Sequence, residues 1–183
     1  MKTKNNFLLL FIFLIGFVFT NCKEANETKK SEFAIMAYYV PEKDYQPENL
    51  PLEKLTHIIF SFTNVIDGEM KFRNPDAGKK LDLLVAQKQQ HPNLKVMIAC
   101  GGWGADGFSD MASSQENRQK FVESAIKFVK EHKLDGIDID WEYPGIPAAG
   151  TKASPNDKKN FTLLMKSLRE NLDKLETPQT LTF

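Results

Sequence analysis

The sequence contains little cysteine and no excess of charge of either sign. Its 183 residues include only two cysteines, and 24 basic residues balance 24 acidic ones. Because phosphate binding needs a basic excess or a basic stripe, the zero net charge gives no reason to expect a nucleic-acid partner. Cys100 lies in an apolar run, where a free cysteine usually behaves as a small buried hydrophobic residue, and neither cysteine has a histidine or cation close in sequence.

The sequence also lacks an apolar run long enough to cross a membrane. The run from Phe7 to Phe19 follows Lys2 and Lys4 and ends just before Cys22. Its length of about a dozen residues is typical of a signal peptide and too short for a spanning helix. Cys22 in this place resembles the lipidated cysteine of bacterial lipoproteins; a plain secretory signal is the alternative.

We therefore expect three parts: a signal peptide (residues 1–22) with Cys22 lipidated, a polar linker (23–31), and a domain from residue 32 onward. In this interpretation the protein is exported, as a membrane-anchored lipoprotein or in secreted form. A lipid at its N-terminus would be its only membrane contact.

From residue 32 the chain alternates apolar β-type runs with amphipathic stretches. The predicted strands are Phe33–Val40, His57–Val65, Leu94–Cys100, Leu134–Trp141 and Thr180–Phe183. These runs are nearly continuous, as expected for a parallel sheet covered by helices. The predicted helices are Asp76–Gln90, Gln115–His132 and Asn156–Leu175, with a short one near Leu52–Leu55. Ser154 or Asn156 can cap the last helix, and Pro178 lies just past its end.

Repeated strand–helix units allow a (β/α)8 barrel or an open doubly wound sheet. No glycine-rich phosphate loop follows the first predicted strand, which counts against a dinucleotide fold. Acidic residues at a strand end favour the α/β barrel. We expect the N-terminal part of such a barrel, strands one to five of eight, and we expect this part alone to be inactive and either to aggregate or to self-associate.

Three acidic residues alternate with apolar ones near one predicted strand end. Asp138, Asp140 and Glu142 project to one face, because side chains two apart in a strand point the same way. At ~6.5–7 Å spacing and an effective dielectric of ~20, neighbouring charges repel by roughly 2.5 kcal/mol. At least one member should therefore hold a proton, as a general acid must. A solvated acidic strand end and a divalent-metal site are the alternatives.

The string from Asp135 to Gly145, DGIDIDWEYPG, resembles the DxxDxDxE signature of family 18 glycoside hydrolases, in its chitinase branch. The resemblance implies a retaining, substrate-assisted mechanism that needs neither cofactor nor metal. Glu142 would be the proton donor, Asp140 would orient the substrate's acetamido group, and Asp138 would share a proton with Asp140. Asp135 is out of step with the row and is expected to be structural. The implied substrate and partner is chitin or another polysaccharide containing N-acetylglucosamine.

Further positions match the same family. The run from Ile98 to Trp103 resembles the SxGG motif at the end of strand three, with Ala99 in place of serine. In this motif Gly102 would let the backbone pack closely near the sugar, and Trp103 would stack on a sugar ring.

Aromatic residues of three other segments complete the expected site. Tyr38 and Phe62, on the first two predicted strands, are expected to line it. Tyr143, beside the acid, matches a position that contacts substrate in the family.

Two other functions stay open at this point. An endo-β-N-acetylglucosaminidase acting on N-glycans would use the same chemistry. A chitinase-like lectin would bind glycan without cleaving it, although such proteins characteristically lose the acid that Glu142 provides here.

Overall fold

The computed structural model describes residues 33–41 and 46–183. The predicted signal peptide, Cys22 and the linker lie outside the described residues. Within the described part of the chain, no helix combines the length and the apolar character that a membrane crossing requires.

All five predicted strands are present, with bounds that differ by a few residues. The strands are β1 (Met36–Tyr39), β2 (His57–Ile66), β3 (Glu69–Lys71), β4 (Lys95–Gly101), β5 (Gly136–Asp140) and β6 (Thr180–Thr182). The helices are α1 (Ala77–Ala86), α2 (Phe108–Ala112), α3 (Gln115–Glu131) and α4 (Asp157–Leu172), with 3₁₀ turns at Pro47–Asn49, Leu52–Lys54 and Gln87–Gln89. The three long predicted helices and the short one near Leu52 are therefore confirmed.

Two short elements were not predicted. Strand β3 pairs antiparallel with β2 after a turn at Asp67 and Gly68, whose φ angles of 54° and 75° are both positive. An Asp-Gly pair between β-type residues is a hairpin signal, so the sequence did contain this information. Helix α2 has five residues, too few for a helical apolar period to be recognised.

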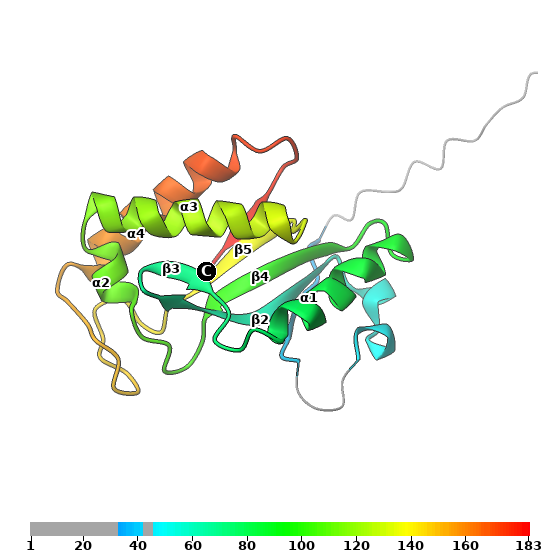
Figure 1. Cartoon of the computed structure of the whole chain (residues 1–183), viewed down its shortest axis with the longest axis horizontal. Helices are drawn as coiled ribbons and strands as arrows, with labels where there is room; N and C mark the ends of the chain where they lie inside the picture. Colours follow the sequence, from blue (N-terminus) through cyan, green and yellow to red (C-terminus); the bar gives the residue numbers. More distant parts are fainter. Residues whose placement is uncertain (1–32, 42–45) are drawn as a thin grey trace, which may run out of the picture. The chain divides into compact units, whose positions relative to one another are not determined.

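The sheet order settles the choice between the two α/β architectures. The parallel strands follow one another as β1-β2-β4-β5-β6, and β3 is attached to β2 outside this path. A doubly wound sheet reverses direction at a switch point, whereas a barrel adds each new strand beside the preceding one. The prediction of a (β/α)8-type barrel is confirmed, and the described residues contain five of its eight strands (Figure 1).

The two faces of the sheet differ in composition. The outer face packs against the helices and forms the main apolar core, to which Phe60, Ile98 and Ile137 contribute from the strands. Helices α3 and α4 lie side by side on this face (Figure 1). The inner face carries a small apolar cluster of Ile59, Met97 and Ala99, with Phe62 packed against it.

The helix ends show which capping predictions hold. Ser114 caps the start of α3, and its hydroxyl accepts a hydrogen bond from the Asn117 amide at 3.1 Å. For α4, Asn156 occupies the N-cap position but its side chain makes no capping hydrogen bond. Ser154, the other predicted cap, accepts a hydrogen bond from the Asn156 amide at 3.3 Å, so the capping prediction holds for Ser154 and not for the side chain of Asn156. The first helical residue, Asp157, directs its carboxylate to the preceding loop instead.

Candidate active site

The three carboxylates of the predicted row lie at the carboxyl end of β5. Asp138 is within the strand and 1% exposed, and Asp140 is the last strand residue. Glu142 follows in the loop of residues 141–156, which we call the acid loop. Ile137, Ile139 and Trp141 belong to the outer core, so the alternation predicted from the sequence is present. Catalytic groups of barrel enzymes occupy this end of the strands.

Both carboxylate oxygens of Asp138 accept hydrogen bonds from hydroxyl groups. The Tyr38 hydroxyl donates to Oδ2 at 2.9 Å, and the Thr182 hydroxyl donates to Oδ1 at 2.5 Å. Thr182 lies opposite Asp138 in the register of β5 and β6, whereas the neighbour on β4 is Ala99, which has no donor. The structure therefore supports Asp138 from β1 and β6. Within the described residues, neither of its oxygens is hydrogen-bonded to Asp140.

The surroundings of the row raise the pKa of Asp140 and of two neighbouring tyrosines. Burial raises the pKa of Asp140, and the charges of Glu142 and Asp138 raise it further. Burial, followed by the hydrogen bond to Asp138, raises the pKa of Tyr38 to about 12. The hydrogen bond and the charge of Glu142 raise the pKa of Tyr143. The surroundings of Asp140 therefore favour its protonated form relative to a free aspartic acid.

The glycines of the motif after β4 allow two close approaches. A Cβ on Gly101, at φ +133°, would lie 1.9 Å from the carbonyl oxygen of Asp140. A Cβ on Gly102, at φ +90°, would lie 3.1 Å from the ring of Phe62. The Gly102 amide donates to the Asp140 carbonyl at 2.9 Å. Glycine is required at both positions, because they bring β4, β5 and Phe62 together at the strand ends.

Two predicted aromatic residues are open to solvent beside the row. Trp103 follows β4 and is 69% exposed, and Tyr143 follows Glu142 and is 46% exposed. Large exposed aromatic rings are unusual on a stable surface and suit stacking against a sugar face. Tyr38 contacts the row directly, whereas Phe62 is half-buried and packs on the inner cluster.

Asp135 and Cys100 do not join the site. Asp135 accepts a hydrogen bond from the Val96 amide of β4 at 2.9 Å and pairs with Lys88 at 2.6 Å. Since Lys88 lies in the 3₁₀ turn after α1, Asp135 connects the start of β5 to β4 and to that turn. Cys100 is fully buried, and burial raises the pKa of its thiol to about 12. A thiol held protonated in this way is not a nucleophile at neutral pH.

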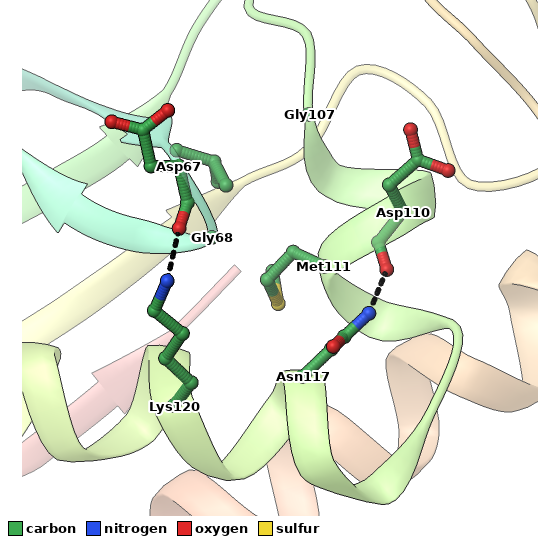
Figure 2. A pocket seen from close by; sticks show the side chains of 8 residues that line it. Asp67, Gly68, Gly107, Asp110, Met111, Asn117 and Lys120 are labelled. Carbon is green, nitrogen blue, oxygen red and sulfur yellow. Dashed lines mark hydrogen bonds between the residues drawn. The ribbon is translucent and has the colours of Figure 1, made fainter.

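Neither a metal cluster nor the pocket drawn in Figure 2 coincides with the row. Among the described residues, no group of three His, Cys, Asp or Glu side chains is arranged to hold a metal ion. Figure 2 shows a pocket of about 360 Å³ between the β2–β3 turn and helices α2 and α3. At its sides Lys120 donates to the Asp67 carbonyl and Asn117 to the Asp110 carbonyl. None of the predicted site residues lines this pocket.

Sequence reasoning missed two polar residues near the row. Thr182 contacts Asp138 across 44 positions in the sequence, and Asp157 is a fully buried carboxylate at the end of the acid loop. The signal for Thr182 was its place in a strand whose neighbour Leu181 packs against the outer core, which turns Thr182 inward. For Asp157 the sequence offers only the capping-box spacing from Ser154, which does not indicate the bonds to Gly145 and Ser109.

Comparison with known proteins identifies the family. The profile of the family described as "Glycosyl hydrolases family 18" matches residues 34–182. An endochitinase of Manduca sexta is 35% identical over 153 residues, covering 76% of this chain and 27% of the relative.

Two solved structures resemble the fold closely. The chitinase domain of the spore coat protein CotE from Clostridium difficile is 37% identical with a TM-score of 0.71, over 81% of this chain and 40% of that one. A family 18 N-acetylglucosaminidase from Paenibacillus barengoltzii is 39% identical with a TM-score of 0.68, over 78% and 41%. The chain therefore spans between about a quarter and two fifths of the length of these relatives. Since the family profile matches nearly all of the described residues, the chain belongs to family 18 of the glycosyl hydrolases.

Proposed function

We propose that the protein is a chitinase that hydrolyses β-1,4 linkages in chitin or N-acetylglucosamine oligomers with retention of configuration. One observation carries the proposal: Asp138, Asp140 and Glu142 alternate at the carboxyl end of β5, where two hydroxyl groups hold the innermost carboxylate. Membership of the family supports it, as does the description of several relatives as chitinases.

In the proposed mechanism each carboxyl group has one task. Glu142 gives its proton to the glycosidic oxygen as the bond to the anomeric carbon breaks. The substrate's own N-acetyl carbonyl oxygen forms the new bond to that carbon, which yields an oxazolinium ion. Water then attacks the same carbon as its bond to the acetamido oxygen breaks, which restores the N-acetyl group, and the water gives a proton back to Glu142.

Asp140 orients the acetamido group and stabilises the positive charge of the ion. Its raised pKa supports this role, because a carboxyl group that holds a proton can donate a hydrogen bond to the acetamido group and can release the proton when positive charge develops. Asp138 accepts hydrogen bonds from Tyr38 and Thr182 and, in this mechanism, shares a proton with Asp140.

The test is release of a chromophore from a chitobiose glycoside by the whole natural protein. Glu142→Gln keeps the size of the side chain but removes the proton, and we expect turnover to fall by roughly 10²–10⁴-fold. Glu131→Gln is the matched control, since Glu131 ends α3 and is exposed. Undiminished turnover by Glu142→Gln would contradict the proposal. Release from a glycoprotein alone would identify an N-glycan enzyme, and binding without turnover a lectin.

We also propose that the protein is exported and anchored by a lipid on Cys22. The apolar run from Phe7 to Phe19, the cysteine after it and the polar stretch that follows support this proposal. Labelling with a radioactive fatty acid in a bacterial host should mark the wild-type protein but not Cys22→Ala. Equal labelling of the two, or none, would contradict the anchor.

A further inference from the structure

Asp157 is a fully buried carboxylate that the proposed mechanism does not use. It is the first residue of α4 and 0% exposed. Its Oδ1 accepts a hydrogen bond from the Ser109 hydroxyl at 2.8 Å, and its Oδ2 accepts from the Ser154 amide at 2.7 Å and the Gly145 amide at 3.3 Å. Burying a carboxylate costs folding free energy unless its oxygens are well hydrogen-bonded, so these three donors are what make the position tolerable.

The three donors come from the two segments that carry the exposed candidates of the site. Gly145 and Ser154 belong to the acid loop, which contains Glu142 and Tyr143. Ser109 belongs to α2, which begins shortly after Trp103. One side chain therefore holds the acid loop at two points and connects it to α2.

Helix capping accounts for only one of the three bonds: the Ser154 amide, three residues before Asp157, is the donor that a capping box uses. The other two bonds come from Gly145, twelve residues away, and from Ser109 of α2, and they lie outside any capping motif. Within residues 33–41 and 46–183 it makes no ion pair with a cation. A buried carboxylate without a cation is less favourable for folding than an apolar residue of the same size. We therefore look for the function of Asp157 in the segments that its hydrogen bonds hold together.

A second connection joins the same two segments on the surface. The Lys152 amide donates to the Asp106 carboxylate at 3.0 Å, and Lys152 Nζ pairs with Asp110 at 2.5 Å. The side chains of Lys152 and Asp110 are both mostly exposed, so their ion pair should contribute little. Lys152 therefore serves as a matched control for Asp157.

We propose that Asp157 is a positioning residue for the hydrolysis: it fixes the acid loop against α2, so that Glu142 keeps one distance from the glycosidic oxygen. The proposal rests on the proposed function. Gly145 lies three residues after Glu142, so a loosened bond at Gly145 shifts the acid directly. A displacement of about 1 Å at the reacting groups can lower a rate by on the order of 100-fold.

The first experiment measures amide hydrogen exchange in the whole natural protein and needs neither substrate nor variant. The Gly145 and Ser154 amides should exchange on the order of 100-fold more slowly than the amide of Gly150, a loop residue without a hydrogen bond within the described residues. Equal exchange rates would overturn the proposal.

The second experiment compares Asp157→Asn with Lys152→Ala. Asn cannot accept all three bonds, so exchange at Gly145 and Ser154 should accelerate and kcat should fall roughly 10- to 100-fold, with a smaller change in KM. Lys152→Ala should keep kcat within about twofold. A folded Asp157→Asn variant with unchanged kcat, or an equal loss in both variants, would overturn the proposal.

The two experiments also separate this proposal from the proposed function. If the wild-type protein turns over no chitin oligomer, the proposed function fails. The exchange rates at Gly145 and Ser154 still show then whether Asp157 orders the acid loop.

Discussion

The outer face of this sheet is apolar and the inner face carries polar groups at the strand ends, and consecutive residues of β5 show the difference. Ile137 and Ile139 point outward and are buried among the side chains of the helices. Asp138 and Asp140 point inward, where hydroxyl groups and like charges surround them. Stability is thus concentrated on one face and polar chemistry on the other. A substitution on β5 should therefore alter folding where the side chain points outward and turnover where it points inward.

The largest expected effect belongs to the outer face. Ile137→Ala leaves a cavity between the sheet and the helices, and it should lower the free energy of unfolding by about 2–5 kcal/mol. Leu83→Ala on α1, where the side chain is 53% exposed, is the control and should change little. Urea denaturation measures both, and equal losses would mean that the outer core is not the main source of stability.

The inner neighbour of Ile137 should respond in the opposite way. Asp138→Asn keeps the shape of the side chain, and it should lower kcat of the whole protein on the order of 100-fold, about 2.7 kcal/mol in activation free energy. Asp135→Asn, just before the same strand, loses its bonds to Lys88 and Val96 and should reduce stability with kcat nearly unchanged. A similar fall of kcat in both would remove the distinction between the two aspartates.

Variants of Thr182 test whether its hydrogen bond to Asp138 contributes to stability, or only the shape of its side chain. Thr182→Val removes the hydroxyl that donates to Asp138 and leaves a buried oxygen without its partner, at a cost of about 1–3 kcal/mol in stability. Thr182→Ser retains the donor and should lose much less. If calorimetry gives equal melting temperatures for the two variants, the hydrogen bond contributes nothing and shape alone matters.

The smallest effect should appear in the pH dependence of Asp140→Asn. The pKa of Asp140 is raised in the folded protein, so its favourable contribution is complete below the unfolded pKa and is lost as pH rises through the folded pKa. Asn does not ionise, so the variant should gain stability relative to wild type between about pH 3.5 and pH 7. The side chain is only partly buried, and solvent screening should keep the gain under about 1 kcal/mol. Denaturation at both pH values measures it, and a constant difference would contradict the expectation.

Much of the fold was readable because its signals are local. The apolar strands and the stripes of α3 and α4 follow periods of two and 3.6 residues, and the carboxylate row follows from the same period of two. Helix α2 and strand β3 are too short to show a period. The contact of Thr182 with Asp138 depends on the register between β5 and β6, which no local pattern specifies. Asp157 resembled an ordinary acidic residue at a helix start until the loop geometry gave it three donors.

The hydrogen bond between Tyr38 and Asp138 joins strands that are not neighbours. Strands β2 and β4 lie between β1 and β5, and in a flat sheet β1 and β5 would be about 14 Å apart at the usual strand spacing. A bond of 2.9 Å therefore requires that the sheet already curls toward its inner face. It also joins residues 100 positions apart, a long separation that is closed late during folding. During refolding, turnover should consequently recover after the helical signal, because the carboxylate row and the curvature of the sheet form in the same event.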